Sequence, residues 1–273
     1  MRGASRTSLG AVTEDLRPVL EGARGTTLGE QLFGVVDVLD GSGPLRRALT
    51  DPARDAEARS GLAQRLLADR VGAEALDVVL RLVRERWSGP RDLADAVEQL
   101  AVLATVSGAS QADESGDGVD RVEEELFRVE RLLSGDRALR AAVSDRYAPD
   151  ASRTALIDRL LGDRVSPGTL LLVRRAAVRS RGLTPEHALT GYGELAAEWR
   201  KRVVALVTTA VPLREEQRQR LVALLSGQYG RAVHLDAAVD PDVVGGVRLE
   251  VGGELVDSTI SSRLGETRRR LAG

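Results

Sequence analysis

The chain has 273 residues, a formal net charge of −2 and no cysteine. Its length allows about one to three domains with buried cores, and its 42% hydrophobic and 29% charged residues are typical of a soluble globular protein. The lack of cysteine excludes disulfides, thiolate nucleophiles and cysteine-ligated zinc. A nearly neutral chain with 3% aromatic residues also lacks the basic field and the stacking surfaces that nucleic-acid-binding proteins use.

The sequence contains no candidate membrane segment. No apolar run approaches the roughly 20 residues that a membrane-spanning helix needs. The first ten residues, MRGASRTSLG, also lack the apolar core of a signal peptide. We therefore expect the protein to stay in the cytoplasm and not to insert into a membrane.

Amphipathic helices are expected throughout the first 106 residues. One apolar face, formed by Leu93, Val97, Leu100 and Ala104, follows the spacing of three and four residues that places side chains on one side of a helix. Glycine and proline clusters separate the expected helices. These helices cover residues 12–20, 28–39, 45–49, 56–68, 73–86 and 91–106.

A change in composition follows these helices. Residues 107–118, SGASQADESGDG, contain no large apolar side chain and are rich in glycine, serine and acidic residues. Such a composition is typical of a solvated linker. We therefore predict a linker at 108–118 between one helical bundle at 1–107 and a second at 119–202.

The residues after this linker repeat those before it. The offset of 139 − 45 = 94 that relates Leu45 to Leu139 also relates the chain's two phenylalanines, Phe33 and Phe127. One added residue then aligns Pro90 with Pro185. We therefore predict two copies of a five-helix unit, with no counterpart for the helix before residue 22, because the linker occupies its place. Eleven further residues are each followed by the same residue type 94 positions later: Leu32, Arg46, Ala48, Asp51, Leu62, Arg65, Leu66, Leu67, Asp69, Arg70 and Val71.

The C-terminal residues 203–273 have a different pattern. Residues 203–211 form an apolar, β-branched run that ends at Pro212, which favours a buried strand. Gly252-Gly253 lies between two short alternating segments and predicts a hairpin turn. The predicted fold is mainly α, with two tandem helical bundles followed by a small α+β domain, a short sheet with two helices. Its other elements are expected at 213–226 (helix), 232–237, 247–251 and 255–257 (strands), and after Asp257 (helix).

This C-terminal region resembles that of the δ subunit of F-type ATP synthases, whose mitochondrial counterpart is the oligomycin-sensitivity-conferring protein. The resemblance covers about the last quarter of the chain and rests on fixed spacings among turn residues. One departure is Arg214, where family members often carry a serine or threonine helix cap. The matching turn residues are Asp240, Pro241, Gly245, Gly246, Gly253 and Asp257.

The resemblance implies a non-catalytic stator protein. Members of the family carry one helical bundle, so this chain resembles a member with its bundle duplicated, an arrangement associated with actinobacterial enzymes. In the family, the first and fifth helices of the bundle form a groove for the N-terminal helix of one α subunit, which here implies residues 7–20 and 73–86. The C-terminal region is implied to bind the b-type peripheral stalk, at the cytoplasmic face of the membrane.

The residues themselves indicate no catalytic, cofactor or metal site. His187 and His234 are far apart and have no supporting carboxylate pattern, so structural or solvent-facing roles are favoured. The glycine pairs lack the flanking residues of a phosphate-binding loop. An alternative is a helical adaptor or regulator that binds nucleic acid or a ligand. This alternative predicts a basic face or a deep polar pocket, whereas a stator predicts exposed apolar grooves that bind helices.

Overall fold

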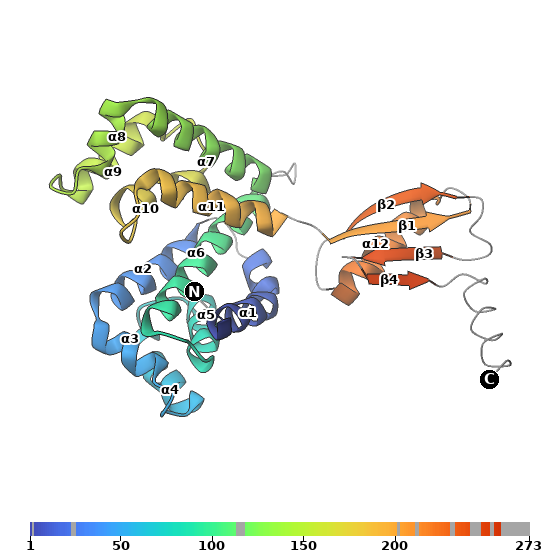
Figure 1. The fold of residues 1–273 in the computed structure, drawn as a ribbon, viewed down its shortest axis with the longest axis horizontal. Coiled ribbons are helices and arrows are strands. Elements are labelled where there is room, and N and C mark those ends of the chain that lie inside the picture. The colour runs from blue at the N-terminus through green and yellow to red at the C-terminus, as the bar shows by residue number, and fades with distance from the viewer. Residues whose placement is uncertain are drawn as a thin grey trace. The chain divides into compact units, whose positions relative to one another are not determined.

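A computed structural model describes residues 1, 3–22, 26–112, 118–200, 203–210, 213–229, 233–240, 247–251 and 254–257. The chain divides into two compact units, Met1–Arg200 and Lys201–Gly273. The first unit is helical and the second contains a small sheet (Figure 1). No helix in these described ranges is long and apolar enough to cross a membrane.

Six helices make up the first part of the helical unit. Short polar caps separate them, as at Ser42, whose hydroxyl accepts a hydrogen bond from the Leu45 N–H at 3.3 Å. Asp55 accepts the N–H of Ala58 in the same way at 2.6 Å. The helices are α1 (Gly3–Gly22), α2 (Thr27–Gly41), α3 (Gly43–Thr50), α4 (Ala56–Leu67), α5 (Ala73–Arg84) and α6 (Pro90–Ala112).

The next five helices confirm the predicted duplication. Three of them begin and end 94 positions after α3, α4 and α5, and the last begins 95 positions after α6, as the added residue requires. The fold class inferred from the sequence, two tandem helical bundles and a small sheet, is therefore correct. These helices are α7 (Gly118–Gly135), α8 (Arg137–Ser144), α9 (Asp150–Leu161), α10 (Pro167–Val178) and α11 (Pro185–Arg200).

The two copies also share their local hydrogen bonds. Asp51 and Asp145 each accept the N–H of the residue two positions later at 2.9 Å. Arg59 and Arg153 are both buried, and each donates to the C-terminal end of an equivalent helix: Arg59 to the carbonyls of Arg84 and Glu85 at the end of α5, and Arg153 to the carbonyl of Ala177 in α10. Unpaired carbonyls at a helix end favour a cation there, and the duplicated arginines supply it in both copies.

The predicted linker at 108–118 is partly wrong, because α6 extends into it as far as Ala112. Ser107, in the same helix, is only 3% exposed. Small residues in this stretch pack against α10, where Thr105 and Ala109 lie close to Gly168. Burial of these helix faces outweighs the loop-like composition. The described chain resumes at Gly118 with α7.

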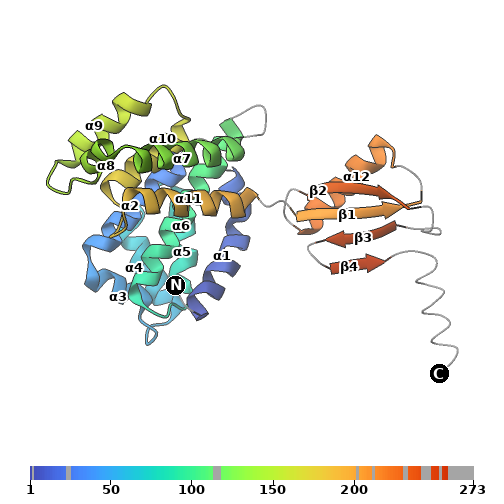
Figure 2. The same cartoon turned by 45° about the horizontal axis from the view of Figure 1, so that its top comes forward.

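The C-terminal half of α6 also corrects the expectation that the first helix has no counterpart. It contacts α10 and α11, just as α1 contacts α5 and α6. Leu9 and Val12 of α1 are buried, and the residues 94 positions later, Leu103 and Val106, are buried as well. Helix α6 therefore serves as the last helix of the first copy and the first helix of the second (Figures 1 and 2).

The C-terminal unit contains a four-stranded sheet in the order β2-β1-β3-β4. Strand β1 pairs in parallel with β2 and antiparallel with β3, and β4 pairs back on β3. The helix α12 (Glu215–Tyr229) connects the parallel pair and packs against β2. The predicted final helix lies outside the described residues. The strands are β1 (Val203–Thr209), β2 (Val233–Val239), β3 (Val247–Val251) and β4 (Glu254–Asp257).

Gly29→Ala should destabilise the helical unit by about 2–3 kcal/mol, because a side chain there overpacks a close helix contact. A Cβ at Gly29 would lie 2.1 Å from the Thr105 hydroxyl and 3.1 Å from the Ala101 carbonyl of α6. Denaturant unfolding followed by helical circular dichroism measures the change.

The matched control is Gly34→Ala in the same helix. A Cβ at Gly34 meets nothing within 4 Å, so this substitution should stabilise the protein by about 0.5–1 kcal/mol through helix propensity alone. Equal effects of the two substitutions would contradict the close contact between α2 and α6.

Candidate functional site

The described residues contain no cluster of three or more histidine, cysteine, aspartate or glutamate side chains that could hold a metal ion. His187 is exposed at the start of α11, where its Nδ1 lies 2.9 Å from the Thr184 hydroxyl. This contact belongs to the cap of the helix. The side chain of His234, in β2, lies outside the described residues.

Glu125 forms the most buried polar cluster of the second copy. Its Oε2 accepts hydrogen bonds from the Ser166 N–H at 2.8 Å, the Ser166 hydroxyl at 2.7 Å and the Thr169 hydroxyl at 2.7 Å. Burial alone would raise the pKa of Glu125, but the hydrogen bonds from Thr169 and Ser166 outweigh it and lower this pKa. Since Ser166 caps α10, the cluster fastens α10 to α7 and is structural.

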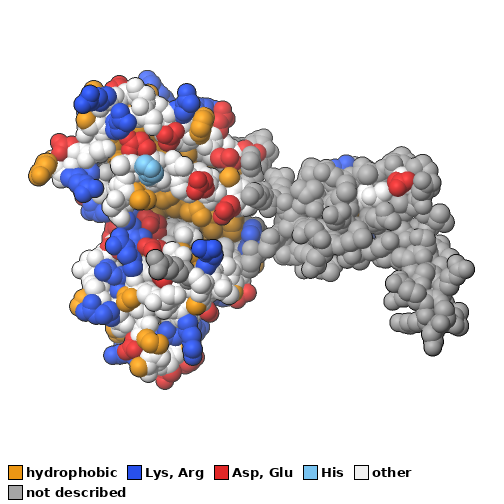
Figure 3. Space-filling model, viewed as in Figure 1, with side chains coloured by type: hydrophobic (Ala, Val, Ile, Leu, Met, Phe, Trp, Pro, Cys, Tyr) orange, Lys and Arg blue, Asp and Glu red, His pale blue; other side chains and the backbone are white. Residues whose placement is uncertain are grey.

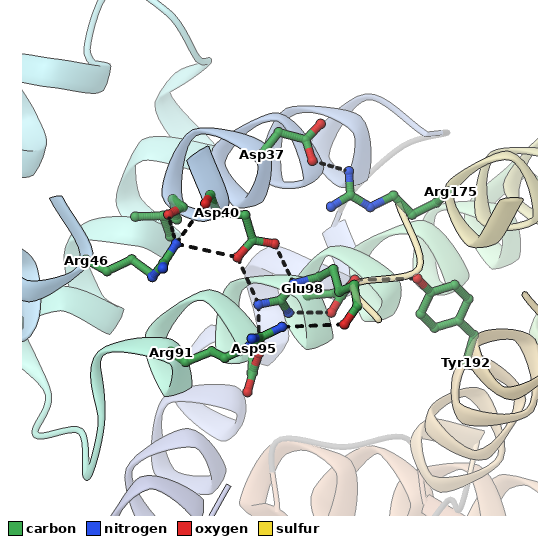
Figure 4. Close-up of polar contacts among 10 residues, drawn as sticks. Asp37, Asp40, Arg46, Arg91, Asp95, Glu98, Arg175 and Tyr192 are labelled. Atoms are coloured by element: carbon green, nitrogen blue, oxygen red, sulfur yellow. Dashed lines mark hydrogen bonds and ion pairs between the residues drawn. The ribbon is translucent and has the colours of Figure 1, made fainter. Parts of the chain in front are cut away.

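Arg181 forms an ionic cluster with three carboxylates, and this cluster joins the two copies. Its guanidinium lies 2.6 Å from Asp40 of α2, and 2.8 Å and 2.7 Å from Asp95 and Glu98 of α6 (Figure 4). Burial alone would lower the pKa of Arg181, but its hydrogen bonds to Asp40 and Glu98 outweigh it and raise this pKa. Burial, followed by the charge of Glu98, also raises the pKa of the Tyr192 phenol, whose oxygen lies 3.5 Å from that carboxylate.

Arg181 lies in the connection that carries the added residue of the second copy. The connection between α10 and α11 is one residue longer than that between α5 and α6. It contains a left-handed turn, with φ of 53° at Arg181 and 93° at Gly182. A positive φ costs energy for a non-glycine residue, and the three carboxylates stabilise the arginine in that conformation.

A second contact between the copies involves an aromatic ring. The Arg175 guanidinium lies 4.9 Å from the centroid of the Phe33 ring in α2. It also lies 2.6 Å from the Asp37 carboxylate of the same helix (Figure 4). Cation–π stacking and an ion pair therefore act on the same buried arginine. Together, Arg175 and Arg181 hold α2 against the second copy.

A cleft of about 590 Å³ lies between α11 and α6. An apolar strip follows this hollow across the helical unit (Figure 3). Arg91 and Arg181 line it together with Asp95, Glu98 and Glu198. Because the Arg181 side chain is already paired with carboxylates, the cleft presents mixed charge and no basic surface.

The turn residues that carry the resemblance lie only partly within the described chain. Asp240 follows β2, and its N–H donates to the Thr209 carbonyl at the end of β1 at 2.9 Å. Asp257 ends β4 opposite Arg248, so the two aspartates lie at the same end of the sheet. Outside the described residues lie Pro241, Gly245, Gly246 and Gly253.

Glu125→Gln should cost about 2 kcal/mol of unfolding free energy at pH 7, because the charged acceptor of three hydrogen bonds is lost. A lowered pKa in the folded state means that the carboxylate stabilises the protein above the unfolded-state pKa, about 4.3. This contribution is lost as pH falls through the lower folded-state pKa. Denaturant unfolding from pH 7 down to about pH 3.5 should show the difference from wild type shrinking.

The control for this prediction is Glu124→Gln, one position earlier in α7. Glu124 is 65% exposed and pairs with Arg128, so its loss should change stability by less than about 1 kcal/mol at either pH. A difference at Glu125 that stays constant with pH would contradict the hydrogen-bonded carboxylate.

Arg181→Ala should destabilise the helical unit by about 3 kcal/mol, because it leaves three carboxylates without their shared cation. Arg174→Ala is the control, since Arg174 pairs with Asp158 at 2.6 Å but both side chains are 39% exposed. The control should lose less than about 1 kcal/mol. Similar losses for the two variants, measured by denaturant unfolding, would argue against Arg181 as the connection between the copies.

Comparison with known proteins identifies the family. A family model described as ATP synthase delta (OSCP) subunit matches residues 103–271. The chain is 47% identical to ATP synthase subunit delta of Kineococcus radiotolerans, covering 99% of this chain and 98% of that protein. It is 46% identical to ATP synthase subunit delta of Beutenbergia cavernae over the full length of both, and 46% identical to that of Streptomyces avermitilis over 99% and 98%.

The match to the family model begins inside α6. Its first residue, Leu103, lies where α6 passes from the first copy to the second, so the model spans the second copy and the C-terminal unit. This start agrees with the packing, in which the second copy takes its first helix from α6. On the family model and the full-length relatives together, the chain belongs to the ATP synthase delta (OSCP) subunit family.

Proposed function

We propose that this chain is the non-catalytic connector of an F-type ATP synthase stator. In this role, the helical unit binds the N-terminal helix of one α subunit of the catalytic head, and the C-terminal unit binds the b-type stalk. The chain then acts at the cytoplasmic face of the membrane and resists rotor torque during proton-driven ATP synthesis. Family membership over the full length of relatives named as delta subunits is the observation that carries this proposal.

The contact between α1 and α5 supports a head-binding groove in the first copy. Helix α1 buries Leu9, Val12, Leu16 and Leu20 in the core, which fixes it beside α5 and α6. On α5, Leu76 and Leu80 are half-buried and lie one turn apart. A partly exposed apolar edge on a helix that is fixed in the core suits the apolar face of another helix.

The corresponding groove of the second copy is already filled. There the C-terminal half of α6 and α10 stand in the places of α1 and α5. Helix α2 packs along α6, with Gly29 at Thr105, and its Phe33 ring lies beneath the Arg175 guanidinium of α10. A groove that holds α2 has no room for another helix, which favours the first copy as the site for the head.

The ionic contacts between the copies suit a part that transmits force. Arg181 binds carboxylates on both α2 and α6, and α6 continues from one copy to the other. A buried arginine with several partners resists separation more strongly than exposed ion pairs do. Torque applied at the first copy would therefore reach the second without a flexible joint.

The test is calorimetric titration of the full chain with two peptides, the N-terminal helix of its own α subunit and the C-terminal segment of its own b subunit. Both should bind saturably. The double variant Leu76→Gln, Leu80→Gln should weaken the α peptide by about tenfold or more, because apolar anchors dominate such contacts. Point variants are preferable to deleting the first copy, since any such deletion also cuts α6.

Two control variants separate the copies. Arg65→Gln changes an exposed residue of α4, which is not part of the α1–α5 groove, and should leave the affinity for the α peptide unchanged. Leu170→Gln alters the residue of the second copy that corresponds to Leu76, and this variant should also keep the affinity for the α peptide unchanged. A loss seen only with Leu170→Gln would move the groove to the second copy. If neither peptide bound the folded chain, the connector would be refuted and an adaptor or regulatory role would be favoured.

A further inference from the structure

The two copies differ at one pair of equivalent aromatic residues. Phe33 in α2 is 4% exposed, whereas Phe127, at the equivalent position in α7, is 61% exposed. Phe33 is covered because the second copy packs on the first and places Arg175 over its ring. The face that the first copy uses to hold a helix is therefore open in the second copy.

A groove of about 720 Å³ follows this open face between α7 and α11, which pack side by side (Figure 1). Its lining on α7 runs from Asp120 to Glu130, about 15 Å of helix, or roughly three turns. Phe127 and Leu126 lie on one side and Leu189 and Ala197 of α11 on the other. The shape therefore suits a helix of about three turns with an apolar stripe.

The rim of this groove is acidic. Among the described residues that line it there are five carboxylates and no lysine, arginine or histidine. Arg131 lies beside the ring, with its guanidinium carbon 6.0 Å from the centroid of Phe127. Charge complementarity favours a basic partner. The acidic lining residues are Asp120, Glu123, Glu124, Glu130 and Glu194.

A second copy of this chain does not match the groove. Consider a dimer in which α7 of one molecule packs on α1 and α5 of another, as α2 packs on the second copy within one molecule. Two residues of α7 would then make unfavourable contacts. Arg131 replaces Asp37 and Arg81 replaces Arg175 at the equivalent positions, so an ion pair would become two arginines. Glu123 would also enter the close contact that Gly29 makes with Thr105.

We propose that the α7–α11 groove binds an amphipathic helix supplied by another polypeptide, with an apolar stripe over Phe127 and lysine or arginine along its edges. This surface is separate from the head contact proposed above, because it lies on the second copy and on other helices. The tandem repeat provides the precedent, since in the first copy the equivalent face holds the arginine-bearing α10.

The experiment uses the full chain and a fluorescent peptide of about 18 residues, made of leucine, alanine and lysine with leucine on one helical face. Fluorescence anisotropy should show saturable binding that weakens as salt concentration rises. Phe127→Ala and Gly193→Leu should each weaken it by about tenfold. Because a Cβ at Gly193 meets nothing within 4 Å, the leucine fills the groove without disturbing the fold, and it improves helix propensity.

Two matched controls and one altered peptide complete the test. Leu132→Ala removes another exposed apolar residue of α7, and Gly191→Leu fills open space elsewhere on α11; both should retain binding. A peptide with glutamate in place of lysine should not bind. Unchanged affinity in Phe127→Ala and Gly193→Leu, or no saturable binding by the wild-type chain, would overturn the proposal.

Discussion

The helical unit depends on α6 being one uninterrupted helix. Its N-terminal half completes the first copy, and its C-terminal half begins the second, so the two copies share a rigid element. Thr105 marks the closest crossing, because Gly29 of α2 and Gly168 of α10 both approach it. Helices that approach this closely need a glycine at the contact. Arg181 and Arg175 then fix α2 against the second copy.

Periodicity and self-similarity predicted most of this architecture. The apolar spacing and the glycine and proline breaks placed α2, α3, α4 and α5 to within two residues at each end. Helix α1 begins nine residues before the predicted start at 12 (12 − 3 = 9), and α6 ends six residues after the predicted end at 106 (112 − 106 = 6). The offset of 94 predicted equivalent contacts as well, because Asp51 and Asp145 cap their turns identically. Because the same residues recur at equivalent positions in both copies, a structural signal in one copy can be checked against the other.

The linker prediction from composition was partly wrong, because close helix packing at this point uses small residues in place of large apolar side chains. Residues 107–112, SGASQA, have the composition of a linker, yet this stretch is helical and its Ala109 lies against Gly168 of α10. The identities of Leu9 with Leu103 and Val12 with Val106 at the same offset were the available signal. The Arg181 cluster and the open groove at Phe127 could not be predicted, since both depend on how one copy packs on the other, which is a long-range property absent from local pattern.

The proposed stator role requires the chain to carry force, and α6, which the two copies share, provides a continuous helix from one copy to the other. Amide hydrogen exchange of residues 101–112 in the full chain tests this continuity most directly. If α6 is uninterrupted, these amides should be protected to a degree similar to those of α2. Exchange of residues 107–112 at the rate of an unfolded peptide, with residues 90–106 still protected, would contradict the shared helix and restore a linker between the copies.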